Sequence, residues 1–218
     1  AGVAGSGQGE LIEAVFGLRK PKTGTITYKG QDITFATPKE KREKKIGYVP
    51  QDRLATGCST DCSLVENCIM GYHVAHRFRN PLLVNKKEAE DFTRKVVEQF
   101  QVKTQDIHDK MGTLSGGNIQ KAIVGREFLQ DNDLLIIEDP TRGIDVGAKY
   151  EIYLLMDQLA NSGVSIIMIS SEMPEIMAVS DRIMVMHEGT VTGELSFEEY
   201  TEEDIMKLAS GEKQSGRE

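Results

Sequence analysis

The sequence predicts an α/β fold in which a mainly parallel sheet carries an inserted helical subdomain. Short runs of strand-forming residues alternate with runs whose apolar residues recur at helical spacing, which is typical of parallel strand pairing. Over 52–111 the strand patterns stop and helical spacing continues. We therefore expect a core formed by 1–51 and 112–210, a helical subdomain over 52–111 and a disordered tail over 211–218.

Length and charge limit the class of protein. A chain of 218 residues can bury about 70% of the surface that it exposes when unfolded. The net charge of −8 argues against a nucleic-acid partner, because such proteins carry a basic face. The sequence shows neither a signal peptide nor an apolar run of membrane-spanning length. We expect a soluble chain that reaches a membrane only through a partner.

The three cysteines do not form a recognisable metal pattern. Cys58, Cys62 and Cys68 have the spacing C-x3-C-x5-C, which matches no common zinc motif, and no histidine lies at ligand spacing from them. We interpret them as ordinary reduced thiols.

The first elements follow from local patterns. Glu10–Phe16 is predicted to be a helix after a glycine turn, and Thr25–Tyr28 a strand of strong strand formers between two turns. Pro38 is predicted to occupy the first position of a short charged helix, where proline is favoured. Ile46–Val49 has the composition of a short buried strand.

Helical spacing dominates the next part of the chain. Leu64–Tyr72 and Lys86–Phe100 carry apolar residues at helical intervals and are predicted to be helices of the inserted subdomain. Asn118–Leu129 is predicted to be an amphipathic helix, and Leu134–Ile137 a buried strand.

The last part of the chain continues the alternation. We predict a helix over Lys149–Asn161, a strand over Ser165–Ile169 and a short helix over Pro174–Val179. Arg182–Met186 and Thr190–Gly193 are predicted to pair as a hairpin across a glycine-containing turn.

Two glycine-rich stretches are candidates for binding phosphate. Gly2–Gly7 has the spacing of a phosphate loop, which normally follows a buried strand, so we expect N-terminal strands to be missing from this sequence. Ser115, Gly116 and Gly117 stand before a helical pattern, where free backbone N–H groups make an anion site. Two such stretches in one chain suggest a nucleotide shared between two proteins.

The first stretch departs from an intact phosphate loop, G-x-x-x-x-G-K-[ST]. Gln8 occupies the lysine position and Gly9 the Ser/Thr position, so the cation on the phosphates and the hydroxyl on Mg²⁺ are both lost. Losing one charge-assisted hydrogen bond weakens binding by about 10–150-fold. A tight glycine turn without a ligand stays open as an alternative. The backbone cradle is retained at four positions: Gly2, Gly5, Ser6 and Gly7.

The stretch Leu114–Asn118 resembles the signature motif of ATP-binding cassette (ABC) ATPases. The glycine loop, Gln51, the signature, the acidic pair Glu138-Asp139 and the loop at Asp145 follow one another in that family's order. The resemblance covers nearly the whole chain and implies a P-loop NTPase-like fold with ATP and Mg²⁺ as cofactors.

A narrower resemblance rests on the residues 114–121, 140–148 and 170–175. They are similar to the second, C-terminal cassette of dual-cassette importer ATPases for simple sugars such as ribose and galactose, or for nucleosides. This resemblance implies a peripheral protein on the cytoplasmic face of the cell membrane. Its implied partners are a first ATP-binding cassette, transmembrane permease subunits and, indirectly, a substrate-binding protein, with no nucleic acid.

The resemblance also assigns roles to individual residues. Gln51 and Glu138 are implied to approach Mg²⁺, and Asp139 to orient the attacking water. The family has Asp before Glu, so the order is inverted here, and a misplacement of about 1 Å can cost about 10²-fold in rate. Ser171 stands at the family's switch histidine and cannot carry its positive charge. Asp145, in the loop after the acidic pair, is implied to be one of the nucleotide-binding residues.

The chain's own glycine loop, acidic pair and switch position differ from the family's pattern. Its signature motif is nearly intact. We expect the chain to complete a partner's ATP site through its signature and to hydrolyse ATP slowly at its own site. A non-hydrolysing regulatory or docking cassette is an alternative. A soluble ABC ATPase acting on DNA or ribosomes is another, which the acidic charge and the short insert disfavour.

Overall fold

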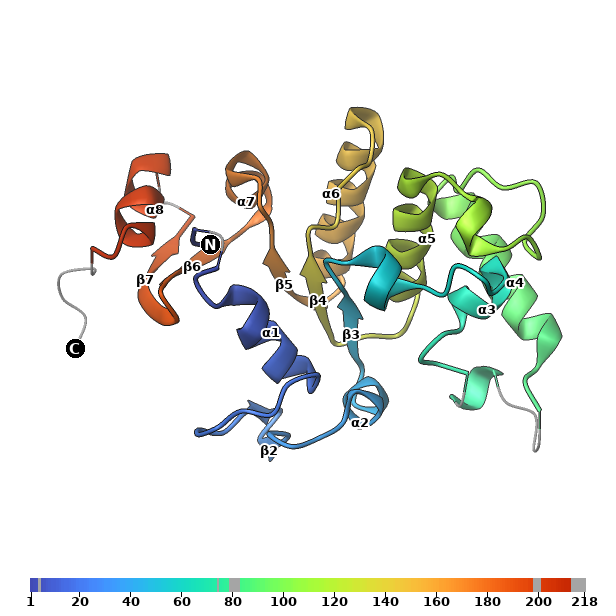
Figure 1. Cartoon of the computed structure of the whole chain (residues 1–218), viewed down its shortest axis with the longest axis horizontal. Coiled ribbons are helices and arrows are strands. Elements are labelled where there is room, and N and C mark those ends of the chain that lie inside the picture. The colour runs from blue at the N-terminus through green and yellow to red at the C-terminus, as the bar shows by residue number, and fades with distance from the viewer. Residues whose placement is uncertain (4, 74, 79–82, 198–200, 213–218) are drawn as a thin grey trace. The chain divides into compact units, whose positions relative to one another are not determined.

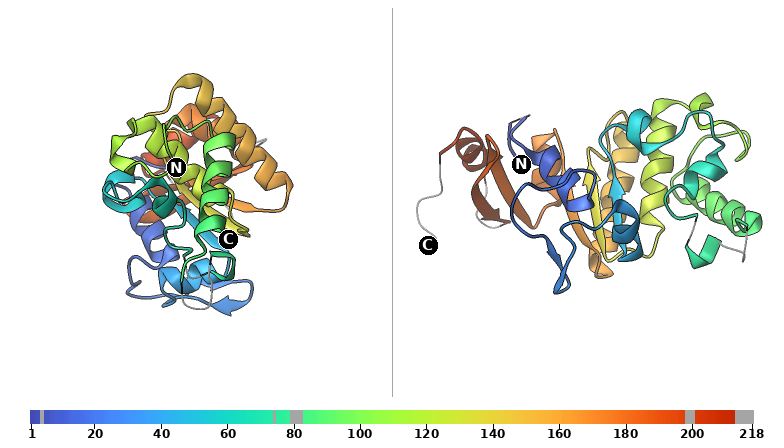
Figure 2. Two further views of the ribbon diagram at one scale, coloured as in Figure 1. Left: turned by 90° about the vertical axis from the view of Figure 1, so that its right-hand side faces the viewer. Right: turned by 60° about the horizontal axis from the view of Figure 1, so that its bottom comes forward.

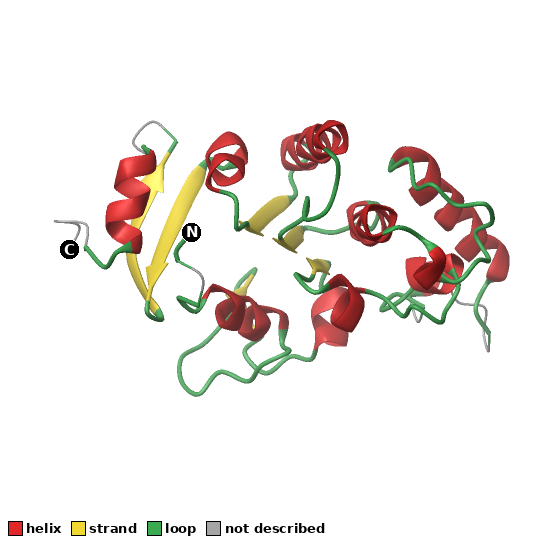
Figure 3. Cartoon of the chain, turned by 45° about the horizontal axis from the view of Figure 1, so that its top comes forward, coloured by secondary structure: helices red, strands yellow, loops and turns green. Residues whose placement is uncertain are grey.

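The computed structural model divides into two compact units. The first combines Ala1–Pro38 with Met168–Glu218, and the second is Lys39–Ile167. Each unit contains strands and helices (Figure 3). Among the described residues, no helix is long and apolar enough to cross a membrane. The structure describes five ranges: 1–3, 5–73, 75–78, 83–197 and 201–212.

These two units do not follow the boundaries of the predicted core and helical subdomain. That division of the chain stays a prediction. The predicted disordered tail lies mostly outside the described residues, from 213 onward.

The sheet with the strand order β3-β4-β5 lies in the second unit except for the end of β5, because this unit ends at Ile167 (Figure 1). Its strands are β3 (Ile46–Val49), β4 (Leu134–Glu138) and β5 (Ser165–Ile169). β3 pairs with β4 in parallel, from Ile46 opposite Leu134 to Val49 opposite Ile137. Both strands are apolar and almost wholly buried, as parallel strands covered on two faces require. The predicted parallel pairing and the predicted strands are confirmed.

Helices surround this sheet. α3 and α4 lie beside α5 at the end of the unit away from β5 (Figures 1 and 2). The predicted helices are confirmed, although α3 ends before the predicted boundary at Tyr72. In the part of this unit that the structure describes, the α-helices are α2 (Pro38–Glu43), α3 (Leu64–Cys68), α4 (Lys86–Gln99), α5 (Gly116–Phe128) and α6 (Val146–Asn161).

The prediction that the helix after the signature is amphipathic is wrong. Every residue of α5 from Ala122 to Phe128 is buried. The helix lies between β3 and α4, and a Cβ placed on Gly125 would lie only 2.7 Å from the ring of Phe100. A helix covered on opposite sides has no solvent face to keep polar.

The first unit is built around the hairpin of β6 (Arg182–His187) and β7 (Thr190–Ser196), which is antiparallel as predicted. The unit also contains α1 (Gln8–Phe16) and α7 (Met173–Val179), both close to prediction. The predicted strand over Thr25–Tyr28 is shorter, because only β1 (Thr27–Tyr28) pairs with a two-residue strand, β2 (Gln31–Asp32). The apolar core of the first unit is formed by α7, the hairpin and a last helix. Its buried residues are Ile176, Ile183, Val185, Leu195, Ile205, Leu208 and Ala209.

That last helix, α8 (Glu202–Ala209), was not predicted. Thr201 and Asp204 form a capping box at its start, in which each side chain bonds the backbone N–H of the other residue. Ile205 and Leu208 face the hairpin core. A capping box before apolar residues at helical spacing is the signal that could have identified it.

Candidate nucleotide site

The signature motif forms the start of α5, as the sequence predicts. Ser115 is the N-cap of this helix, and its Oγ accepts hydrogen bonds from the backbone N–H (3.5 Å) and side-chain amide (2.8 Å) of Asn118. Within the described part of the chain, the N–H groups of Gly116 and Gly117 have no hydrogen-bond partner. Two bare amides at a helix N-terminus favour an anion.

A hollow of about 410 Å³ opens beside this helix start. The start of α6 contributes Asp145 to its lining, so two helix N-termini reach the same space. Lys103 and Lys121 bring two cations, and Glu151 adds a carboxylate. The hollow therefore combines the bare amide of Gly117 and two ammonium groups with two carboxylates.

Asp145 is fixed as the N-cap of α6. Its Oδ1 accepts the backbone N–H of Ala148 at 3.0 Å. This hydrogen bond, with smaller contributions from the charges of Lys121 and Lys103, lowers the pKa of Asp145. The carboxylate is therefore ionised at neutral pH and holds the loop that precedes the helix.

Gln51 and Asp139 come together at the carboxyl end of the sheet. Gln51 follows β3 and Asp139 follows β4, and the Nε2 of Gln51 donates a hydrogen bond of 2.9 Å to Oδ2 of Asp139. Asp139 is buried and has a left-handed backbone with φ of 44°, which aspartate tolerates better than most residues. The parallel register explains how residues so far apart in sequence meet here.

Glu138 has a different environment from Asp139. Its buried carboxylate accepts a hydrogen bond of 2.5 Å from the hydroxyl of Tyr48. The carboxylates of Glu138 and Asp139 are hard oxygen ligands of the kind that Mg²⁺ takes, whereas the hydrogen bond turns the amide nitrogen of Gln51 toward Asp139. Gln51, Glu138 and Asp139 thus supply a donor set that suits Mg²⁺, and the predicted metal role of Gln51 and Glu138 stays a prediction.

The glycine loop belongs to the first unit. The backbone of Ala1 pairs with β6, where its carbonyl accepts the N–H of Met186 at 2.8 Å. Gly5 and Gly7 then turn the chain with φ of 85° and 97° into α1. Residue 4 lies outside the described residues. The Ser6 side chain is buried, and its carbonyl accepts the N–H of Gly189.

Gln8 closes this loop on itself. Its Nε2 donates a hydrogen bond of 3.3 Å to the carbonyl of Val3, and a Cβ placed on Gly2 would lie 2.4 Å from the same nitrogen. Gln8 stands at the position where a phosphate loop carries its lysine, and its side-chain amide is directed across the loop at the Val3 carbonyl. Gly9, in the first turn of α1, offers no side chain.

Ser171 is exposed in the loop between β5 and α7, also in the first unit. Its neighbour Ser170 accepts the N–H of Glu172 at 3.0 Å and donates to the carboxylate of Glu175. The structure thus groups the glycine loop with Ser171 in one unit. It groups Gln51, the acidic pair, the signature and Asp145 in the other.

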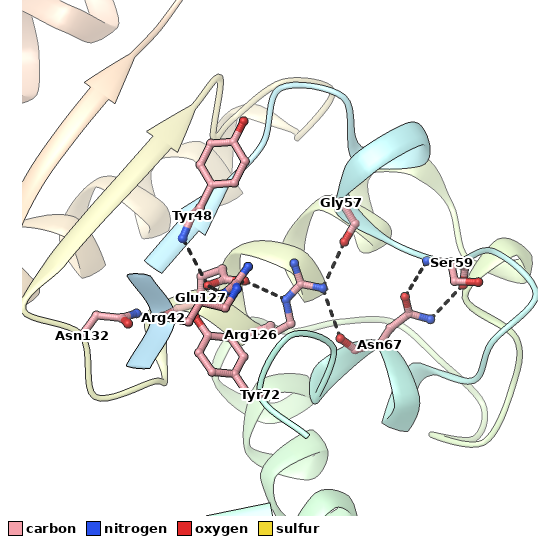
Figure 4. Close-up of polar contacts among 9 residues, drawn as sticks. All are labelled: Arg42, Tyr48, Gly57, Ser59, Asn67, Tyr72, Arg126, Glu127 and Asn132. Carbon is pink, nitrogen blue, oxygen red and sulfur yellow. Dashed lines mark hydrogen bonds and ion pairs between the residues drawn. The ribbon is translucent and has the colours of Figure 1, made fainter. Parts of the chain in front are cut away.

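Sequence reasoning missed a buried ionic cluster around Glu127 in α5 (Figure 4). The carboxylate accepts hydrogen bonds from Arg42 (2.9 Å), Tyr72 (2.5 Å) and the backbone N–H of Tyr48. Arg126 donates to it at 3.0 Å. The cluster joins α2, β3 and the region of α3 to α5. Two adjacent charged residues in an otherwise apolar helical stretch were the available signal.

The charges in this cluster compensate one another. Burial alone would raise the pKa of Glu127, but the charges of Arg42 and Arg126 and the hydrogen bonds from Arg42 and Tyr72 outweigh it and lower the pKa. Arg126 also donates to the carbonyls of Gly57 and Asn67, at 3.0 and 3.2 Å. The buried carboxylate is therefore ionised and fully hydrogen-bonded.

Comparisons with known proteins agree with this geometry. The model of the ABC transporter family matches residues 1–142. The ribose import ATP-binding protein RbsA of Lactococcus lactis subsp. cremoris is 42% identical over 213 residues, which cover 98% of this chain and 43% of that protein. The ribose import ATP-binding protein RbsA 1 of Rubrobacter xylanophilus is 40% identical over 210 residues, covering 96% and 42%.

A solved structure supports the fold. A dimeric ATP-binding cassette in a post-hydrolysis state, bound to ADP and Pi, superposes with a TM-score of 0.75 at 18% identity, covering 89% of this chain and 82% of the other. This likeness confirms the predicted P-loop NTPase-like fold. The chain spans about two-fifths of the length of the curated relatives that it matches.

Proposed function

The chain belongs to the ABC transporter family, and from this premise we propose that it is the second of two ATP-binding cassettes in an importer of a simple sugar such as ribose. The motifs at 114–121, 140–148 and 170–175 support the assignment to a second cassette. The chain spans about two-fifths of the length of its relatives, which is the share expected of one cassette in a protein that contains two. The names of these relatives favour a sugar over a nucleoside.

The observation that carries the proposal is the pair of bare amides at Gly116 and Gly117, at the start of α5. In the proposed assembly these amides and the Ser115 hydroxyl bind the γ-phosphate of an ATP held by the partner cassette. Lys103 and Lys121 raise the local positive potential, and the Asp145 loop meets the partner. The signature thus completes a site whose phosphate loop belongs to the other cassette.

The chain's own half-site is proposed to bind nucleotide weakly and to turn it over slowly. Gln8 offers a neutral donor that is already directed at the Val3 carbonyl, and Gly9 offers no hydroxyl. Ser171 cannot supply the charge of a histidine. The departures at Gln8 and Ser171 each remove a charge-assisted contact with the triphosphate, which is worth about 1.5–3 kcal/mol, and the departure at Gly9 removes a hydroxyl that would hold Mg²⁺.

At this half-site, Asp139 is proposed to orient the attacking water and to accept its proton, with Gln51 holding the carboxylate in place. A magnesium ion held by Gln51 and Glu138, as the family resemblance implies, would neutralise charge on the phosphates. Glu138, bonded to Tyr48, would fix the end of β4 and the position of its neighbour.

The partners follow from the same proposal. The chain would work with a first cassette and with permease subunits in the membrane, at the cytoplasmic face. A substrate-binding protein would act through the permease. The permease and the binding protein would select the sugar, since no residue of the cassette would contact it.

A regulatory or docking cassette that binds but does not hydrolyse ATP is the second candidate. The contact between Gln8 and Val3 favours it, because it closes the loop at the position where the phosphates would need a cation. The two candidates differ only in the chain's own half-site, since both use the signature in the same way.

Uptake assays test the proposal. The full-length protein, reconstituted in vesicles with its permease and binding protein, should drive ATP-dependent accumulation of labelled ribose, with galactose and a nucleoside as competitors. Accumulation of ribose without ATP, or of none of these compounds with ATP, would contradict the proposal. Under trapping conditions, one tightly bound nucleotide for each pair of cassettes is expected.

A further inference from the structure

Arg53 reaches two glycines, Gly116 at the start of α5 and Gly143 in the turn before α6. Its Nη1 donates a hydrogen bond of 3.1 Å to the carbonyl oxygen of Arg142. A Cβ placed on Gly116 would lie 2.6 Å from Arg53 Nη2, and a Cβ placed on Gly143 would lie 3.0 Å from Nη1. The guanidinium therefore occupies the space that side chains at 116 and 143 would need.

Other side chains hold the same turn at its beginning. Gln51 bonds the carboxylate of Asp139, and the buried amide of Gln120 donates a hydrogen bond of 3.2 Å to the carbonyl of Pro140. Arg53 adds the contact at the far end, where the chain continues into α6. The turn over 139–143 is thus bonded at its two ends to Gln51 and Arg53, which follow β3, and at Pro140 to Gln120 of α5.

We propose that Arg53 is a positioning residue that sets the distance between the signature turn at Gly116 and the loop at Asp145. A planar guanidinium carries several donors in fixed directions, so one group can bond the Arg142 carbonyl while it lies against two glycine Cα atoms. Its charge also lies near the bare amide of Gly116, where it favours an anion. The consequence for ATP turnover rests on the proposed function, whereas the contact itself does not.

Amide hydrogen exchange in the full-length protein tests the contact directly. The N–H groups of Arg142 and Ile144 report on the turn, because they bond the carbonyls of Asp139 and Thr141 within it. Arg53→Met should raise their exchange rates by about tenfold or more relative to the amides of β4, which report global unfolding. Arg53→Lys, which keeps the charge without the planar group, should restore only part of the protection.

Gly116→Ala provides an independent arm. A methyl group at 116 displaces the Arg53 guanidinium, so this variant should raise exchange at Arg142 and Ile144 as well. The double variant of Gly116→Ala and Arg53→Met should raise these exchange rates no further than the more disruptive of the two single variants does. Arg94→Met is the matched control, because Arg94 is exposed on α4 and pairs only loosely with Glu90 at 3.7 Å.

Unchanged exchange in Arg53→Met, or effects of the two substitutions that simply multiply, would overturn the proposal. A second readout concerns the assembled transporter, where Arg53→Met should lower kcat by about tenfold and leave the KM for ATP nearly unchanged. A protein without ATPase activity would count against the proposed function, and the exchange result would still decide the role of Arg53.

Discussion

The side-chain amide of Gln51 donates a hydrogen bond of 2.9 Å to Oδ2 of Asp139, which joins the end of β3 to the end of β4. Val49 and Ile137 are register partners, so the two strands end at nearly the same level of the sheet. Two residues that the family resemblance links to ATP hydrolysis therefore meet because of the strand register, although 88 positions separate them.

This contact predicts coupled effects of Gln51→Ala and Asp139→Ala. Because each variant removes the same hydrogen bond, a double-mutant cycle by urea unfolding should give a coupling energy of about 0.5–3 kcal/mol. Asp61→Ala, which removes an exposed carboxylate, should combine additively with Gln51→Ala. Additive effects of the Gln51 and Asp139 substitutions would contradict the observed contact.

Gln8→Lys should strengthen nucleotide binding by the chain's own loop. The ammonium group would restore a charge-assisted contact with the phosphates, so the Kd for ATP should fall by about tenfold or more. Gln31→Lys adds the same charge in β2 and should leave the Kd unchanged. Equilibrium titration with ATP measures both, and an unchanged Kd in Gln8→Lys would show that the missing cation does not limit binding.

Glu127→Gln should destabilise the protein severely. The substitution leaves Arg42 and Arg126 without their shared counter-ion in a buried site, which typically costs about 3–5 kcal/mol. Urea unfolding measures the loss of stability, with Glu98→Gln on the exposed side of α4 as the control variant. A loss no larger than in the control would mean that the cluster contributes little.

The same cluster predicts how stability depends on pH. The folded-state pKa of Glu127 lies below its unfolded value of about 4.3, so its contribution is fully present above that value. It is lost as the pH falls through the lower folded-state pKa. The difference in unfolding free energy between wild type and Glu127→Gln should therefore shrink below about pH 4. A constant difference down to pH 2 would be inconsistent with this cause.

Local patterns were sufficient for most of the fold. The runs at Ile46–Val49 and Leu134–Ile137 are continuously apolar, and the structure places them as paired buried strands. The pattern failed for α5, because the burial of its second side depends on Phe100, which caps the end of α4 and which no local period contains. It also missed α8, although Thr201 and Asp204 mark its start.

Residues of the candidate site could be predicted where they belong to a sequence motif, but not where their role depends on contacts between distant segments. The sequence identified Ser115 as a residue just before a helix, and the structure confirms it as the N-cap. It gave no sign of Arg53, whose contacts with Gly116 and Gly143 exist only once three separate segments meet. The family resemblance implied different roles for Glu138 and Asp139 but not their contacts, and the structure gives the two residues different hydrogen-bond partners.

The central claim is that Ser115 and the amides after it complete a partner's ATP site. Ser63 provides a matched control, because it is also an N-cap serine, bonded to the N–H of Glu66 at 3.2 Å, and losing either cap costs about 1 kcal/mol. The measurement is ATP turnover by the assembled two-cassette protein. The account predicts that Ser115→Ala lowers turnover by about tenfold or more, while Ser63→Ala and Gln8→Ala retain most of it. Turnover abolished by Gln8→Ala and preserved in Ser115→Ala would contradict it.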